Sequence, residues 1–250
     1  MVSLLAALVT TGGSSVTDIT ILAASSLKAP LTEIAKNFES NHPNARLHLS
    51  FAGSQELATQ IKLGASADLF FSADRAQMSE VLVAGKASWN KVEPFAANEL
   101  SLLVSKEAST KIRSLADLNT PNLKICIGGH KVPIGAYTRQ ALEKASGKFG
   151  APWLSAVRSN FVSMEPNVSA IVSRVEMNEA DAGIVYKTDA IRAKRSIAIP
   201  IPRPWNVRTQ YFAVVLKQTQ NRKLSEAFLS LVLASNGQKV LAKFGFLRPK

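Results

Sequence analysis

The chain has 250 residues, 46% of them hydrophobic, and a formal net charge of +12. This length and composition are sufficient for one large hydrophobic core or two modest ones. A single cysteine, Cys126, excludes an intrachain disulfide and a cysteine-rich metal site. The basic excess lies in residues 126–250, which hold 19 Lys and Arg against 7 Asp and Glu, whereas residues 1–125 hold 11 of each.

The basic residues of the second half are scattered along the chain. They form no zinc-finger spacing, RNA-recognition signature or basic coiled-coil region, so we expect no nucleic-acid partner. Attraction of small anions, contact with an acidic membrane, and a simple solubility bias remain open explanations for the charge.

The N-terminal segment has the character of an export signal. Residues 2–10 form an apolar run that is too short to span a membrane, and small, flexible residues follow at 11–15. The run resembles the apolar region of a secretory signal peptide, although a positive segment before it is missing. No cysteine follows it, so a lipoprotein anchor is not indicated. We expect residues 1–17 to precede the fold and the protein to be secreted to the periplasm.

Beyond this segment, short apolar strands alternate with helical patterns, which predicts an α/β protein with mostly parallel, covered sheets. The expected strands are residues 19–24, 47–51, 69–71, 100–105, 123–127, 162–164, 182–186 and 212–216. The clearest helical patterns follow residues 26, 54, 135 and 167, and two more helices are expected before the C-terminus. Strands near 100–105 and 211–216 are candidates for two crossovers between lobes.

Two short turns carry a serine between a strand and a helix. Ser26 follows the strand 19–24, and Ser54 follows the strand 47–51. At such junctions the first backbone N–H groups of the helix have no partner, and the positive end of the helix dipole points outward. A hydroxyl beside those N–H groups makes an anion site that needs no positive side chain. Each serine could instead be an ordinary N-cap.

Seven short segments, in order, resemble the bacterial periplasmic molybdate-binding proteins of ABC importers, which are type II periplasmic binding proteins. The resemblance covers nearly all of residues 19–247. The matching segments are 23–27, 51–54, 67–70, 132–137, 167–168, 183–186 and 244–246.

The resemblance implies a two-lobe fold, each lobe a mostly parallel sheet flanked by helices, joined by two crossover strands. Residues 18–99 and 212–250 would form the first lobe, and residues 100–211 the second. It also implies a set of neutral oxyanion ligands, with no direct metal ligand and no cofactor. Their expected members are Ser26 and Ser54 from the first lobe, backbone N–H groups of Ile134 and Val168 from the second, and the phenolic O–H of Tyr186.

Local sequence agrees with these assignments. Pro133 and Gly135 suit a tight turn that enters a helix, and Asn167 is a suitable N-cap before Val168. Tyr186 follows a buried strand, so its O–H needs a polar partner. The resemblance further implies a monomeric carrier of molybdate or tungstate that delivers its ligand to a permease and, through it, to an ATPase.

Three alternatives to this carrier remain open. A hydrolase would need a nucleophile with a base, but the three histidines, His42, His48 and His130, form no known catalytic motif. A transcription regulator would need a DNA-binding segment, and none precedes residue 19. A carrier of another oxyanion or of a small organic anion is the third alternative. The pair Asp68 and Asp74 is expected to be structural or to support the hinge.

Overall fold

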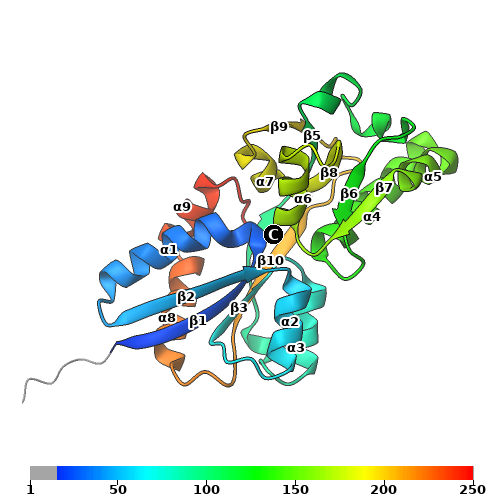
Figure 1. Ribbon diagram of the computed structural model, residues 1–250. Coiled ribbons are helices and arrows are strands. Elements are labelled where there is room, and N and C mark those ends of the chain that lie inside the picture. Colours follow the sequence, from blue (N-terminus) through cyan, green and yellow to red (C-terminus); the bar gives the residue numbers. More distant parts are fainter. Residues whose placement is uncertain (1–15, 250) are drawn as a thin grey trace, which may run out of the picture.

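The computed structural model describes residues 16–249, which form two lobes, each built on a five-stranded sheet (Figure 1). The expected leader segment 1–17 therefore lies outside the described residues except for Val16 and Thr17, and Thr17 already pairs with Ala45 in the first strand pair. Within the described part of the chain, we find no helix that combines the length and the apolar character needed to cross a membrane.

The first sheet has the strand order β2-β1-β3-β10-β4. Its strands are β1 (Thr17–Ala24), β2 (Ala45–Ala52), β3 (Leu69–Ser72), β4 (Glu93–Asn98) and β10 (Thr209–Val215). The strand β1 is parallel to both β2 and β3, whereas β10 is antiparallel to β3 and β4. The β1–β2 pairing ends at Ala24 and Ala52, so the two strands stop at the same edge of the sheet.

Alternating side chains of the first sheet fill two separate layers, as the period of a strand requires. Ile21 and Phe71 belong to the core on one face, with residues of α1 and α8, while Leu22 and Phe70 belong to the core on the other face, with residues of α2 and α3. The helices of this lobe are α1 (Lys28–Asn41), α2 (Ser54–Lys62), α3 (Arg75–Val83), α8 (Arg222–Leu233) and α9 (Ser235–Lys243).

The second sheet repeats the arrangement with the order β7-β6-β8-β5-β9. Its strands are β5 (Leu100–Ser105), β6 (Ile125–Gly128), β7 (Phe161–Glu165), β8 (Ala182–Tyr186) and β9 (Ser196–Pro200). Here β6 is parallel to β7 and β8, and β5 is antiparallel to β8 and β9. The helices are α4 (Pro133–Phe149), α5 (Ala151–Ser159), α6 (Val168–Glu176) and α7 (Lys187–Arg192).

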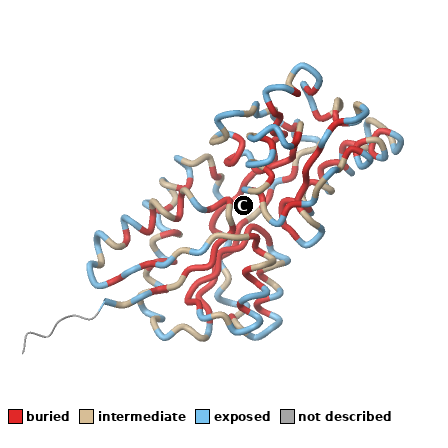
Figure 2. The backbone as a smooth tube through the Cα atoms, viewed as in Figure 1, coloured by how far each residue is buried: buried red, intermediate tan, exposed pale blue. Residues whose placement is uncertain are grey.

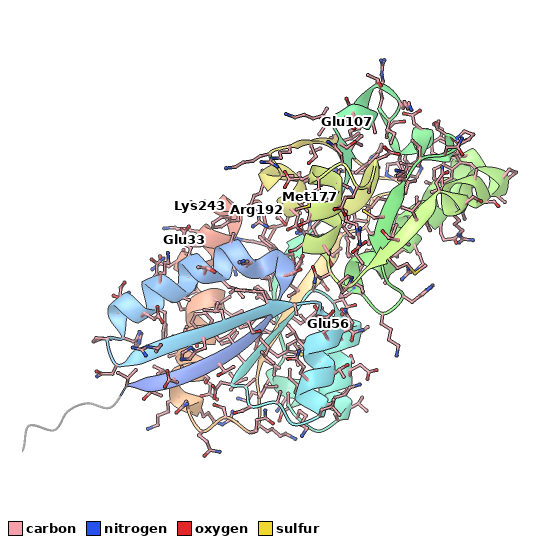
Figure 3. The ribbon with its side chains drawn as sticks, viewed as in Figure 1. Glu33, Glu56, Glu107, Met177, Arg192 and Lys243 are labelled. Atoms are coloured by element: carbon pink, nitrogen blue, oxygen red, sulfur yellow. The ribbon has the colours of Figure 1, made fainter. Side chains whose placement is uncertain are left out.

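Within residues 16–249, the chain passes between the lobes at two places. Glu99 alone separates β4 of the first sheet from β5 of the second, and the segment 201–208 leads back from β9 to β10. The C-terminal helices then return to the first lobe, where Lys243 of α9 lies 2.8 Å from a carboxylate oxygen of Glu33 on α1 (Figure 3). Figure 2 shows that buried positions follow the strands of both sheets, and the main hydrophobic cluster runs through both lobes.

The structure confirms the two-lobe α/β fold. Each sheet is mixed: four of its five strands run in one direction, and one strand, β10 in the first sheet and β5 in the second, is antiparallel to both of its neighbours. The helix expected to start near Ala136 begins three residues earlier, at Pro133. Strands β4 and β9 and helices α5 and α7 were not expected. The division into a first lobe of residues 18–99 and 212–250 and a second lobe of residues 100–211 stays our proposal.

Candidate anion-binding site

In the first lobe, chain topology brings Ser26 and Ser54 together. The connection from β1 to β2 and the connection from β2 to β3 lead to opposite sides of β1, so their helices α1 and α2 lie on opposite faces of the sheet. A crevice forms at the strand ends where such connections diverge. The short 3₁₀ turn 25–27 follows β1 and α2 follows β2, so each serine lies two residues beyond a paired strand end.

The second lobe presents the same kind of crevice. The helix α4 follows β6 and α6 follows β7, which are neighbours in the sheet, and the two helices begin beside one another at the strand ends. Pro133 is the first residue of α4 and has no N–H, so Ile134 carries the first N–H of that helix. Val168 is the first residue of α6, and its preceding N-cap, Asn167, accepts a hydrogen bond from the Ala170 N–H, as expected.

All five residues expected to hold the ligand line one cavity between the lobes. The space that the centre of a water molecule can reach is about 10 Å³, so the cavity suits one compact group rather than an extended molecule. The residues that line it are Ala24, Ser25, Ser26, Ala52, Gly53, Ser54, Ala73, Val132, Pro133, Ile134, Asn167, Val168 and Tyr186. None of these described residues is charged. The helix N-termini that meet here supply the positive potential instead.

Two glycines allow the backbone segments around the cavity to approach one another closely. A side chain at Gly53 would have its Cβ 2.5 Å from the carbonyl oxygen of Pro166 in the opposite lobe. A Cβ at Gly135 would lie 2.1 Å from the carbonyl oxygen of Gly128, at the end of β6. Both distances are shorter than the non-bonded contacts that a Cβ atom makes, so glycine is required at both positions for the cavity walls to close.

Neither serine is an N-cap, because the N-cap positions are occupied by Ala24 and Gly53. Instead, the Ser54 hydroxyl oxygen accepts a hydrogen bond from the Ala73 N–H at 3.1 Å, and the Ser26 hydroxyl lies 3.1 Å from the Tyr211 hydroxyl. The Ser54 proton is therefore free to point elsewhere. Ser26 has the same freedom when Tyr211 is the donor.

The Tyr186 hydroxyl is the most telling group in the cavity. The residue is 1% exposed, and its hydroxyl oxygen has no hydrogen-bond partner among the described residues. Burial raises the pKa of Tyr186 well above its ordinary value, and the nearby Tyr211 raises it further. Tyr186 therefore keeps its proton and remains a hydrogen-bond donor without an acceptor, which is costly for a buried polar group.

A buried polar network behind the cavity was not foreseen from the sequence. Tyr211, fully buried in β10, has its hydroxyl 3.5 Å from the Asn98 amide nitrogen as well as 3.1 Å from Ser26. The same Asn98 nitrogen donates to the Thr188 hydroxyl of the second lobe at 2.9 Å. Burial raises the pKa of Tyr211 far above its ordinary value, so its hydroxyl also stays protonated.

Besides Asn98, three side chains of the described residues bridge the lobes around the cavity, and they too were not foreseen. The amide nitrogen of Gln55 donates to the Pro166 carbonyl at 2.8 Å, and that of Gln77 donates to the Lys131 carbonyl at 3.1 Å. The Tyr137 hydroxyl lies 3.5 Å from the carbonyl oxygen of Ala73, a residue of the cavity wall. These neutral contacts hold the lobes closed on different sides of the site.

The residues that a hydrolase would need have other positions. His48 is paired with Asp18 at 2.6 Å on the outer edge of the first sheet, and His42 stacks on Phe38 at the end of α1. His130 is exposed between β6 and α4 and does not line the cavity. Over residues 16–249, no cluster of His, Cys, Asp and Glu is suited to hold a metal ion.

The two aspartates serve the fold, as expected. Asp68 accepts a hydrogen bond from the Thr20 N–H at 2.7 Å and another from the Thr219 hydroxyl. Asp74 is the N-cap of α3 and accepts from the Gln77 N–H at 2.9 Å. They do not form a carboxylate pair.

Two lobes that enclose a small, uncharged cavity define a solute-binding protein. The chain belongs to the family of bacterial extracellular solute-binding proteins, whose model matches residues 19–247.

Curated relatives and solved structures agree with this family. The molybdate-binding protein ModA of Mycobacterium tuberculosis (strain ATCC 25618 / H37Rv) is 36% identical over 93% of this chain and 85% of its own length. A putative ABC transporter substrate-binding lipoprotein of Bacillus subtilis, YvgL, is 32% identical over 91% of this chain and 85% of its own length. The periplasmic molybdate-binding protein of Azotobacter vinelandii shares the fold, with a TM-score of 0.75, 22% identity and coverage of 93% of this chain and 100% of the other.

Proposed function

We propose that the protein captures molybdate, and tungstate with it, in the interlobe cavity and delivers it to an ABC importer. The observation that carries the proposal is the buried, unpartnered donor of Tyr186 in a small cavity onto which three helix N-termini open. The assigned ligand set is the hydroxyls and N–H groups of Ser26 and Ser54, the N–H groups of Ile134 and Val168, and the Tyr186 hydroxyl. The relatives named as molybdate-binding proteins support this choice of ligand.

A neutral site can hold a dianion because each N–H or O–H bond to it is charge-assisted. A closed, dry cavity strengthens these bonds further, since no water competes for the donors. We propose that the site favours the larger tetrahedral molybdate and tungstate over sulfate by size, a choice that the names of the relatives support. An organic anion would need a larger apolar pocket.

The proposed setting is extracytoplasmic. The family consists of extracellular solute-binding proteins, and we propose secretion to the periplasm through the N-terminal segment, without a lipid anchor. The Bacillus relative carries the name of a lipoprotein, so the form of attachment differs within this group. We propose a monomer that docks on a permease and acts through it with an ATPase. It performs no catalysis in this scheme.

Titration calorimetry with molybdate, tungstate, sulfate and phosphate tests the proposal. We expect tight one-to-one binding of molybdate and tungstate, and loss of this binding in the Ser26→Ala, Ser54→Ala double variant. The double variant Ser40→Ala, Ser159→Ala is the matched control, because these two exposed hydroxyls bond only to carbonyls of their own helices. Absence of binding for all four oxyanions would refute the function, and sulfate binding as tight as molybdate binding would refute the size argument.

A further inference from the structure

A second pocket lies beside the oxyanion cavity and differs from it in charge. It has a volume of about 370 Å³ and is lined by Arg75, Tyr137, Arg208, Gln210 and Phe212. Two of these five residues are cationic, whereas the oxyanion cavity has no charged residue in its wall. The pocket therefore offers an anion fully charged groups, whereas the cavity offers it neutral hydrogen-bond donors.

Both arginines keep donors free for a ligand. The guanidinium of Arg75 lies 5.6 Å from the centre of the Phe212 ring, a cation–π contact that orients the group and leaves its N–H edge open. Arg208 donates one N–H to the carbonyl oxygen of Arg248 at 2.7 Å. Among the ion pairs of residues 16–249, neither arginine has a carboxylate partner. The nearby Asp74 caps α3 instead.

One side chain, that of Tyr137, forms the boundary between this pocket and the cavity. It lines the charged pocket, and its hydroxyl lies 3.5 Å from the carbonyl oxygen of Ala73, which lines the cavity. Its ring centre is 6.4 Å from that of Tyr186, the unpartnered donor inside the cavity. Tyr137 belongs to α4 of the second lobe and Arg75 to α3 of the first, whereas the remaining residues of the pocket lie where the crossover segment enters β10.

We propose that the pocket of Arg75 and Arg208 is an outer anion-binding site, which collects the tetrahedral oxyanion and raises its rate of capture by the neutral cavity. The inference rests on the proposed function, because it assumes that an oxyanion is the ligand. Neutral donors attract an anion only at short range, and full charges act over the Debye length. The outer site therefore supplies the long-range attraction that the inner site lacks.

The size of the effect follows from Coulomb's law. For a dianion about 10 Å from two unit charges in water, neutralising both charges lowers the association rate about sevenfold at 10 mM salt and about threefold at 100 mM. We expect the dissociation rate to change little, because long-range charges act about equally on the bound anion and on the anion that is leaving. A change confined to the association rate separates this role from a structural one.

Stopped-flow measurement of molybdate association and dissociation tests the proposal in the double variant Arg75→Gln, Arg208→Gln. The matched control is Arg46→Gln, Arg113→Gln, which removes the same net charge at two exposed positions. Arg46 lies near the start of β2, opposite the cavity end, and Arg113 lies beyond the far end of β5.

We expect the pocket variant to associate about sevenfold more slowly at 10 mM salt, with a difference that shrinks as salt rises and with unchanged dissociation. The control should change the association rate less than twofold. Equal effects of the two variants would overturn the proposal, since net charge alone would then explain them. A pocket variant that changes only dissociation would also overturn it. If the wild-type protein binds no oxyanion, the proposed function itself fails, and this inference falls with it.

Discussion

Replacing Tyr186 with phenylalanine separates ligand binding from folding more cleanly than other substitutions in the cavity. The change removes one oxygen atom and keeps the ring, which contacts Tyr137 and Tyr211. In the described residues the lost hydroxyl has no partner, so no hydrogen bond within the protein is broken. If the hydroxyl serves the oxyanion, the substitution must weaken binding and leave the ligand-free protein intact.

The magnitudes follow from the two roles of a buried donor. A hydrogen bond to a charged group contributes about 1.5–3 kcal/mol, so molybdate binding should weaken roughly 10- to 150-fold. An unsatisfied buried hydroxyl costs stability, so the ligand-free variant should be as stable as wild type or up to ~1 kcal/mol more stable. That gain would raise its Tm by about 2–4 °C for a chain of this size.

Calorimetry and thermal unfolding, each with and without molybdate, measure both effects. The matched control is Tyr211→Phe, which removes a hydroxyl that does have partners, namely Ser26 at 3.1 Å and Asn98 at 3.5 Å. The control should lose about 1–3 kcal/mol of stability without ligand, because its partners stay buried. A Tyr186→Phe variant that binds molybdate like wild type, or that unfolds as early as the control, would refute the reasoning.

Three further predictions concern closure, pH and the thiol. Replacing Gln55 or Gln77 with alanine should speed molybdate dissociation about 2- to 12-fold, because each lost interlobe hydrogen bond contributes roughly 0.5–1.5 kcal/mol. The control variant Gln60→Ala, at an exposed position on the same helix as Gln55, should leave the dissociation rate unchanged. Burial raises the pKa of Asp189 from 3.8 to about 7, against the opposing charge of its partner arginine. The folded chain therefore holds this proton more tightly than the unfolded chain, so the contribution of Asp189 to the free energy of unfolding falls as the pH rises from about 4 to about 7. Denaturation curves measured across this range should show a weaker pH dependence for the Asp189→Asn variant. Burial raises the pKa of Cys126 to about 12, so a thiol reagent should label it only after unfolding; labelling of the native protein would contradict this buried position.

The parts of the fold that sequence predicts well are those in which pattern and packing agree. The strand β1 reads as a continuous apolar run because both of its faces are covered, and it was expected within two residues of its observed start. The strands β4 and β9 lie at the edges of their sheets, and β4 carries Pro94. An edge strand tolerates proline and exposed residues, so these two segments lack the apolar signal that a central strand gives.

The residues of the candidate site likewise include some that sequence predicts well and some that it does not. Ser26 and Ser54 follow strand ends, and the carboxyl ends of neighbouring parallel strands meet at one edge, so local signals place these two residues together. Ile134 and Val168 also follow strand ends, but they were assigned to the site through the family resemblance. The bridging amides of Gln55 and Gln77 carry no such signal, since a glutamine in the first turn of a helix is ordinary. Tyr211 resembles any aromatic residue of a buried strand, and its role depends on Asn98, which is 113 residues away in sequence.

Hydrogen-bond polarity in the cavity leads to a final prediction about which anions bind. The Ser54 oxygen already accepts from the Ala73 N–H, so its proton is left for a ligand. The Tyr186 hydroxyl and the helix N–H groups are donors as well, and the described lining has no carboxylate. A ligand that carries a proton would therefore place an O–H group where it finds no good acceptor, at a cost of about 1–3 kcal/mol.

Phosphate carries at least one proton near neutral pH, whereas sulfate carries none, although the two anions have the same shape. We therefore expect sulfate to bind roughly 5- to 150-fold more tightly than phosphate, even though both bind more weakly than molybdate. Competition against molybdate at a fixed ionic strength measures this ratio. Phosphate binding as tight as sulfate binding would mean that the cavity accepts a hydrogen bond from its ligand, and the donor-only description of the site would be wrong.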